Sequence, residues 1–312
     1  MYLKIISVGH MWSAPVVGMA VRRNISFNTT WKYLIYMSRV FGFAPISIRK
    51  FEKYEFNWTW MFYSLALSIV TFLFVPSAIR FQEITVGFLI FDARRLLEGF
   101  SALVHHCFLI YHGKKFAYLL NGLPLNTLHK IRTVYSLILA GLTLFLVAGV
   151  MNVFDAIHAF KIYRVSLFNA VLRGFIDICG LSTMLSDIVF ATFVIATKEE
   201  LVVLNHDARR PNMSTFPRSF LSNYVKLTNR TVILNQVFGF PILVSMLLSF
   251  VQITSCLFLV ITKNVDTFKG IFLSWMITFQ LVKVTMKLSV CELASREVSI
   301  LGAFYRFFYK YA

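Results

Sequence analysis

Residues 133–154 read TVYSLILAGLTLFLVAGVMNVF, a stretch of 22 residues without a charged side chain. An α-helix of this length rises about 33 Å, and the hydrocarbon core of a bilayer is about 30 Å thick. A strand of a membrane β-barrel would alternate apolar and polar residues, which this stretch does not do. Backbone polar groups in lipid must be satisfied internally, so the stretch predicts a transmembrane helix.

Apolar segments of similar length lie on both sides of this one. Of the whole chain, 58% of residues are apolar and 14% are charged. In soluble domains about 45–50% of residues are apolar and about 25% are charged. This composition excludes a disordered chain and an ordinary soluble enzyme. We therefore predict an all-α polytopic membrane protein with six transmembrane helices of a helical bundle, at 58–75, 86–110, 133–154, 174–197, 237–262 and 268–291.

Lysines and arginines are distributed unequally between the loops. If the amino terminus is cytoplasmic, 21 of them fall on the inner side and 5 on the outer side. Cytoplasmic loops of membrane proteins carry such an excess. We therefore expect segment 1–57 and tail 292–312 to be cytoplasmic, with 198–236 as a cytoplasmic helical extension. The same bias explains the net charge of +17 without a nucleic-acid partner.

The first residues, Met1–Ala20, are apolar but are interrupted by Lys4, His10 and Pro15. They are too broken to span a bilayer. We interpret them as an uncleaved cytoplasmic segment. A signal peptide is the alternative, because a charged start and a small-residue end are present.

Three short patches carry a family resemblance. They are LIYMSRVFGFAP at 34–45, LTNRTVILNQVFG at 227–239 and CELASREV at 291–298. Residues 216–238 also have helical periodicity, so a helix starts below the membrane and continues into the fifth span. By these patches, and by the order and orientation of its spans, the chain resembles the insect gustatory receptor family of the insect chemoreceptor superfamily over about 31–298.

The resemblance implies a subunit of a ligand-gated, non-selective cation channel in the plasma membrane of sensory neurons. Family members have seven helices, a cytoplasmic amino terminus and a cytoplasmic anchor that joins four subunits. The implied partners are a small-molecule tastant, membrane lipid and other gustatory receptors in a homo- or hetero-tetramer. No cofactor, metal, nucleic acid or enzyme activity is implied.

The family's last helix carries Thr-Tyr, an apolar run and then Gln-Phe, and nothing after Cys291 matches it. We therefore expect the chain to lack this helix, and a non-conducting truncated receptor is one alternative function. A second alternative function is that of a secondary transporter or another polytopic membrane protein. A transporter would show inverted repeats, but Pro241 in the fifth span has no counterpart in the second.

Candidate ligand contacts are chosen by their depth in the bundle. Asp177 and Asp187 would bind a basic or hydroxylated tastant or attract cations, or else would hydrogen-bond to neighbouring helices, since intramembrane charges face a protein or water interior. Aromatic and Met side chains suit an adaptable apolar pocket, with simple packing as the alternative. The predicted ligand-binding residues are Phe154, Asp177, Met184, Asp187, Trp275 and Phe279.

Other polar residues within the spans are interpreted mainly as structural. Lys283 and Lys287 are predicted to extend to the inner headgroups or to line the cytoplasmic side. His105 and His106 are predicted to be polar packing rather than metal ligands. Four charges of the second span sum to zero: Asp92, Arg94, Arg95 and Glu98. They form a polar wall of the ligand vestibule or a neutralised stripe buried against neighbours, or else the span itself is displaced by some residues.

Overall fold

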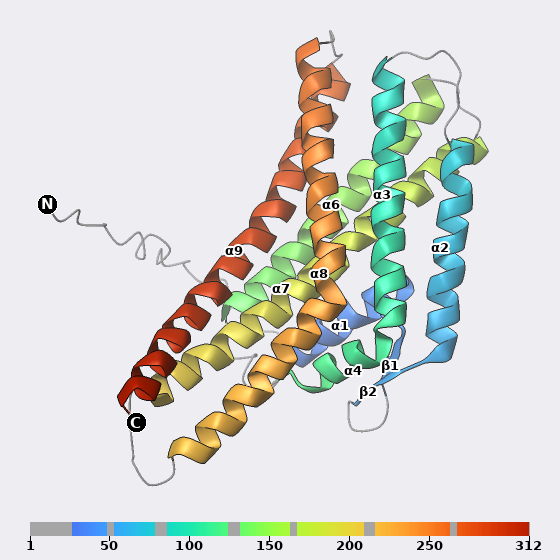
Figure 1. The fold of residues 1–312 in the computed structure, drawn as a ribbon. Coiled ribbons are helices and arrows are strands. Elements are labelled where there is room, and N and C mark those ends of the chain that lie inside the picture. The colour runs from blue at the N-terminus through green and yellow to red at the C-terminus, as the bar shows by residue number, and fades with distance from the viewer. Residues whose placement is uncertain are drawn as a thin grey trace, which may run out of the picture.

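The computed structural model of the protein describes seven parts of the chain. These are residues 27–48, 53–78, 86–123, 132–162, 167–208, 216–262 and 267–311. The predictions for Met1–Ala20 fall outside them. The described elements are eight helices and two short strands (Figure 1): α1 Phe27–Val40, β1 Ile46–Ile48, β2 Tyr54–Phe56, α2 Trp58–Ala78, α3 Val86–Tyr111, α4 Gly113–Asn121, α6 Arg132–Ile162, α7 Leu167–Ala208, α8 Phe216–Thr262 and α9 Thr267–Tyr311.

The long helices run alternately up and down the bundle. In Figure 1, α1, α4 and the two strands lie together at the bottom of the bundle, and we call this end the lower end throughout. Helices α2, α6 and α8 run from that end to the upper end, and α3, α7 and α9 return. This alternation is what successive membrane-spanning helices require.

Helix α7 forms the centre of the bundle and packs against α6, α9, α3, α8, α2 and α1. Every residue from 183 to 197 is buried. A helix that is buried all round needs no polar face, which explains why its sequence lacks an amphipathic pattern. The main hydrophobic core surrounds it, and Phe193 and Phe238 meet there with ring centroids 6.1 Å apart.

A glycine sets the approach of α6 to α7. A Cβ atom at Gly141 would lie 2.6 Å from Cδ1 of Ile188, a side chain with no exposed surface. At Gly149, two turns further along α6, a Cβ atom would meet nothing within 4 Å. Of these two glycines of α6, only Gly141 is needed for the close approach to α7.

The lower end is closed by local hydrogen bonds. Strand β1 pairs antiparallel with β2, with Ile46 opposite Phe56. The Asn121 amide donates to the Tyr54 carbonyl and accepts from its N–H, both at 2.8 Å, which ties α4 to β2. Asn57 accepts from the N–H groups of the first turn of α2 as an N-cap.

Below the main core, α7, α8 and α9 continue together as a layer. Leu201, Leu204 and Leu227 form a small apolar cluster there. Arg230 of α8 forms an ion pair with Glu200 of α7. The described parts of the predicted extension 198–236 are the end of α7, up to residue 208, and the start of α8, from residue 216. Helix α9 continues through the predicted tail to Tyr311.

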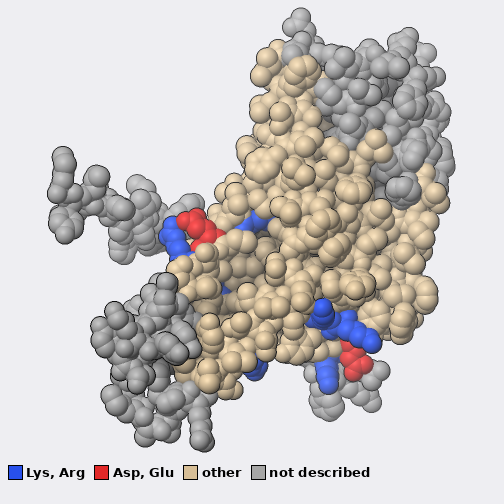
Figure 2. Space-filling model, viewed as in Figure 1, with Lys and Arg blue, Asp and Glu red and all other residues tan. Residues whose placement is uncertain are grey.

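Three described helices contain stretches long and apolar enough to cross a membrane: Ser136–Phe154, Phe220–Ile261 and Gly270–Ser299. Shorter apolar stretches lie in α2 and α3, at Trp58–Val70 and Leu96–Tyr111. On the face drawn in Figure 2, the charged side chains lie at mid-height and below, and the described surface above them is free of charge. Charge and apolar surface are thus separated along the bundle.

Candidate functional site

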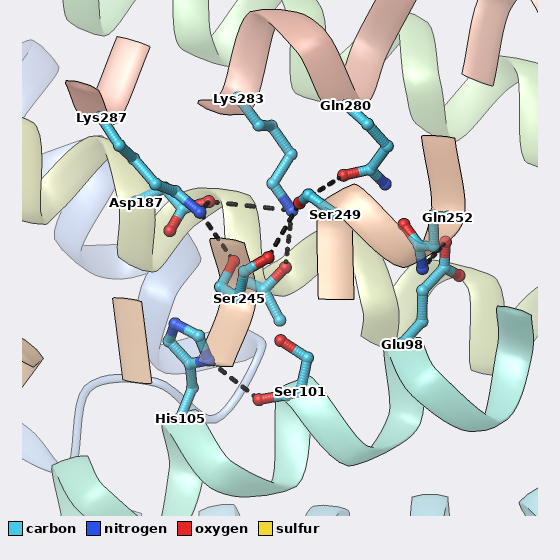
Figure 3. A network of polar contacts seen from close by, with 11 residues as sticks. Glu98, Ser101, His105, Asp187, Ser245, Ser249, Gln252, Gln280, Lys283 and Lys287 are labelled. Atoms are coloured by element: carbon cyan, nitrogen blue, oxygen red, sulfur yellow. Dashed lines mark hydrogen bonds and ion pairs between the residues drawn. The ribbon is translucent and has the colours of Figure 1, made fainter. Parts of the chain in front are cut away.

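Polar side chains follow one face of four facing helices in the middle of the bundle. Within each helix they are spaced three or four residues apart, so they share a face. They point toward one another across the interior in Figure 3. The stripes are Glu98, Ser101 and His105 on α3; Thr183 and Asp187 on α7; Ser245, Ser249 and Gln252 on α8; and Gln280, Lys283 and Lys287 on α9.

The upper parts of these stripes line a cavity. It contains about 30 Å³ of space that water-sized groups can occupy, between the side chains of α3, α6, α7, α8 and α9, and is partly open to the outside. A space of this size holds about one or two water molecules. One wall is apolar, because Trp275, Met276 and Phe279 of α9 face it. The rings of Trp275 and Phe279 have centroids 6.2 Å apart.

The lower boundary of the cavity is charged, and we call the three residues that form it the charged floor. The Lys287 ammonium lies 2.9 Å from an Asp187 carboxylate oxygen, and the Lys283 ammonium lies 3.7 Å from the same oxygen. Asp187 and Lys287 have no exposed side-chain surface, and Lys283 has 7%. Lys283 is the member of the floor that lines the cavity.

Hydroxyl groups complete the contacts of the two lysines. Lys283 donates to Oγ1 of Thr183 at 3.2 Å, and Lys287 donates to Oγ of Ser245 at 2.7 Å. The Lys283 ammonium also lies 5.8 Å from the centroid of the Phe279 ring. Burying a charge is costly unless it is paired and hydrogen-bonded. These contacts explain how two lysines are held inside the bundle.

Amide and hydroxyl groups continue the network above the floor. Ser249 of α8 lies 2.9 Å from Oε1 of Gln280 on α9, in position to donate. Gln252 donates to Glu98 of α3 at 3.3 Å. The cavity therefore offers both donors and acceptors beside its aromatic wall, and a ligand with one polar group and one apolar part would match it.

The two adjacent histidines are held by separate partners. Nδ1 of His105 donates to the Ser101 carbonyl at 2.9 Å, and Nε2 of His106 donates to the Phe41 carbonyl at 3.1 Å. Nδ1 of His106 lies 2.5 Å from Oγ of Ser68. The prediction of polar packing is confirmed for both rings. Within the described residues, no group of three metal-ligating side chains lies together.

Three of the six predicted ligand contacts line this cavity: Asp177, Trp275 and Phe279. Asp187 lies in the floor below it. Met184 is 2% exposed and belongs to the main core. Phe154 is 57% exposed, on the outer surface of α6. Ligand contact at all six positions stays a prediction.

The prediction that Lys283 and Lys287 extend to the headgroups is wrong. Both ammonium groups are buried against Asp187, because a carboxylate on another helix satisfies them where lipid would not. Asp187 itself bonds to a neighbouring helix, the second of the two interpretations of that residue. Glu98 lines the cavity, whereas the side chains of Asp92, Arg94 and Arg95 lie outside the described part of the structure.

The sequence analysis missed the neutral members of the site. They are Ser101, Asn152, Thr183, Ser245, Ser249, Gln252 and Gln280. Their spacing of three or four residues within otherwise apolar spans could have identified them, because a polar stripe on a transmembrane helix faces protein or water rather than lipid. Taken singly, each is a common neutral residue that carries no sequence signal of a binding site.

No protein-family model and no curated protein sequence matches this chain. Among solved structures, one of the insect olfactory receptor OR5 from Machilis hrabei matches with a TM-score of 0.67 and 13% identity, covering 88% of this chain and 81% of that one. A structure of OR5 in complex with eugenol matches with a TM-score of 0.64 and 12% identity, covering 88% and 87%. The chain is therefore a multi-pass, all-α membrane protein with the fold of the insect olfactory receptor OR5.

Proposed function

We propose that this chain is a chemoreceptor of the gustatory type, a subunit of a ligand-gated, non-selective cation channel that detects small-molecule tastants. It acts in the plasma membrane of sensory neurons, in a tetramer with copies of itself or with other gustatory receptors. The observation that carries the proposal is the cavity, which combines a polar network with an aromatic wall inside this fold.

The likeness of the fold to solved olfactory receptor structures supports a receptor over a transporter or an enzyme. One of the OR5 structures that share this fold contains eugenol, a small molecule with one polar edge and an apolar body. The mixed polar and aromatic walls of the cavity suit molecules of that class. Ligand binding between helices biases the bundle toward the conformation that binds better, which is how binding would open a pore.

The test is to express the full chain in oocytes and to record currents evoked by eugenol and other small aromatic probes. We expect an inward current whose reversal potential hardly shifts when external Na⁺ is replaced by K⁺. Uptake of labelled probe without current would favour a transporter. Binding without either would favour a non-conducting receptor, and both outcomes would contradict the channel proposal.

A matched pair of substitutions in α6 links the current to the cavity. Ala148 lines the cavity and is 2% exposed, whereas Ala140 of the same helix is exposed. Ala148→Phe fills the space that a ligand would occupy. We expect the half-maximal probe concentration to rise roughly tenfold or more, which corresponds to about 1.4 kcal/mol. Ala140→Phe should leave it unchanged at equal surface expression, and equal responses of the two variants would disconnect this cavity from gating.

A further inference from the structure

The exposed tyrosine and tryptophan side chains of the described residues gather at the lower end of the bundle. All of them belong to α1, α4 and the adjoining ends of α2 and α3, and they are 40% to 83% exposed. In membrane proteins such side chains concentrate at the level of the lipid headgroups, because one part of the ring is apolar and the other is polar. We call them the aromatic belt: Tyr33, Tyr36, Trp58, Tyr63, Tyr111 and Tyr118.

Helix α1 presents part of this belt on its outer side. Trp31 and Leu34 have no exposed surface and belong to the main core, whereas Tyr33 and Tyr36 are 62% and 55% exposed. A helix that faced only water on this side would carry charged groups there. The Tyr63 hydroxyl of α2 donates to the carbonyl of the last residue of α1 at 2.7 Å. Helix α1 therefore lies beside the start of α2, at the level of the aromatic belt.

The elements that carry the belt are strongly basic. Among the described residues of α1, β1, β2 and α4, together with the residue before β2, five side chains are basic and one, Glu55, is acidic. The basic ones are Lys32, Arg39, Lys53, Lys114 and Lys115. The last three are exposed, and we call them the basic patch. In Figure 2, blue side chains gather at the lower right, where Figure 1 places β1, β2 and α4.

The basic patch is held together because β2 runs alongside α4. At one end of this pair, the Asn121 amide bonds to both backbone polar groups of Tyr54. At the other end, Gly113 lies so close to Phe56 that a Cβ atom at this position would clash with the ring. Lys53 directly precedes β2, and the other two lysines of the patch lie in the first turn of α4. The three ammonium groups therefore extend from one small unit of structure.

This unit lies just outside the apolar stretches of the neighbouring helices. The apolar stretch of α2 begins at Trp58, five residues after Lys53, and that of α3 ends at Tyr111, three residues before Lys114. Electrostatic attraction between exposed charges extends over about one Debye length, which is about 10 Å at 0.1 M salt. The basic patch and the aromatic belt therefore face the same layer of the bilayer.

We infer that the basic patch binds the headgroups of anionic phospholipids in the leaflet at the lower end, while the aromatic belt contacts the same lipids at the level of the glycerol backbone. By the expected orientation this is the cytoplasmic leaflet, which is the one that carries anionic lipid. The inference goes beyond the proposed function, because neither the cavity nor an ion current enters it. The lipid phosphate and carboxylate groups supply the negative charge that the patch lacks.

The experiment is native mass spectrometry of the purified full chain, released from detergent and titrated with phosphatidylserine or phosphatidylcholine that have identical acyl chains. Each lysine near a membrane surface contributes roughly a fivefold gain in affinity for anionic lipid. We therefore expect the first phosphatidylserine to bind at least about tenfold more tightly than the first phosphatidylcholine, with a preference that shrinks as the salt concentration rises. Equal affinities, or a preference that salt does not change, would overturn the inference.

A matched pair of lysine substitutions assigns the preference to the patch. Lys114→Gln should lower the affinity for phosphatidylserine roughly fivefold, and Lys114→Arg should retain it. Lys226→Gln is the control, because Lys226 is an exposed lysine of α8. It precedes Gln236, the residue that accepts from Lys115 at 2.8 Å, by ten residues, which is about 15 Å along the helix. Equal effects of the two Gln variants would refute the assignment.

Soluble glycerophosphoserine distinguishes a lipid from a free phosphate compound, since it has the same headgroup without acyl chains. We expect a large excess of it to leave bound phosphatidylserine in place, because the acyl chains also hold the lipid. Displacement would indicate a site for soluble phosphate and would overturn the proposal of a lipid surface. If Lys114→Gln does not fold, the comparison of the two lipids on the wild-type chain still decides the inference.

Discussion

Substituting Asp187 should affect the stability of the bundle more than substituting either of the two lysines that it contacts. One carboxylate compensates two ammonium groups, so removing the carboxylate leaves two buried cations without a counter-charge. Removing one lysine leaves a balanced pair. The residues are similarly buried, so burial alone would predict similar effects, and the charge arithmetic distinguishes them.

We expect Asp187→Asn to destabilise the bundle by about 3–5 kcal/mol, the range observed when one partner of a buried ion pair is removed. Lys287→Met should cost clearly less, because Asp187 then pairs with Lys283 alone. The measurement is the thermal unfolding midpoint of each purified variant in one detergent. A Lys287→Met protein that is as unstable as Asp187→Asn would contradict the charge arithmetic.

Single residues were predicted unevenly from the sequence. Asp177, Trp275 and Phe279 were selected by depth in a span, and they do line the cavity. The surroundings of Lys283 and Lys287 were predicted wrongly, because the carboxylate that pairs with them is Asp187 of α7, about a hundred residues earlier in the chain. Pairing between distant segments depends on the assembled bundle, and local hydropathy does not contain it.

At the scale of the helix, the contact of α6 with α7 gives a sharp prediction. Gly141→Ala would put a methyl group 2.6 Å from Ile188, and overpacking of this kind costs about 1–3 kcal/mol. The gain in helix propensity of up to about 1 kcal/mol only partly offsets this. We expect the unfolding midpoint to fall by a few degrees, a shift of about 2–4 °C for each kcal/mol.

Gly149→Ala is the matched control on the same helix, since its new methyl group meets nothing within 4 Å. We expect this variant to be as stable as the wild-type chain or slightly more so. If both alanine variants lose stability equally, the cause is not the contact with Ile188, and a general intolerance of α6 to substitution would explain the result better.

The described helices include one at each of the six predicted spans, and α2 begins at Trp58, α3 begins at Val86 and α8 ends at Thr262, as predicted. Other ends differ from the predicted bounds. Hydropathy marks the part of a helix that lies in lipid, whereas α7, α8 and α9 continue into the lower layer, where polar and apolar residues mix. The two strands were missed entirely. Each has three residues, too few for an alternating pattern to be recognised.

At the scale of the whole molecule, the charge bias predicts which side the bundle presents to the cytoplasm. We expect epitope tags at both ends of the chain to be labelled by antibody only after the cells are permeabilised, because the lower end carries the excess of basic residues. The measurement is immunofluorescence on intact and permeabilised cells. Labelling of either end on intact cells would contradict this orientation and would place the cavity toward the cytoplasm.

The position of Asp187 on α7 also has a consequence for biosynthesis. The ribosome completes α7 and all of α8 before it translates the lysines of α9, so the carboxylate enters the translocon without either cation. An unpaired Asp at the centre of a helix costs about 2.5–3.5 kcal/mol on insertion. The central helix therefore remains incompletely matched to its surroundings until α9 inserts, and the final described helix decides whether the nascent chain is retained as a folded protein or degraded.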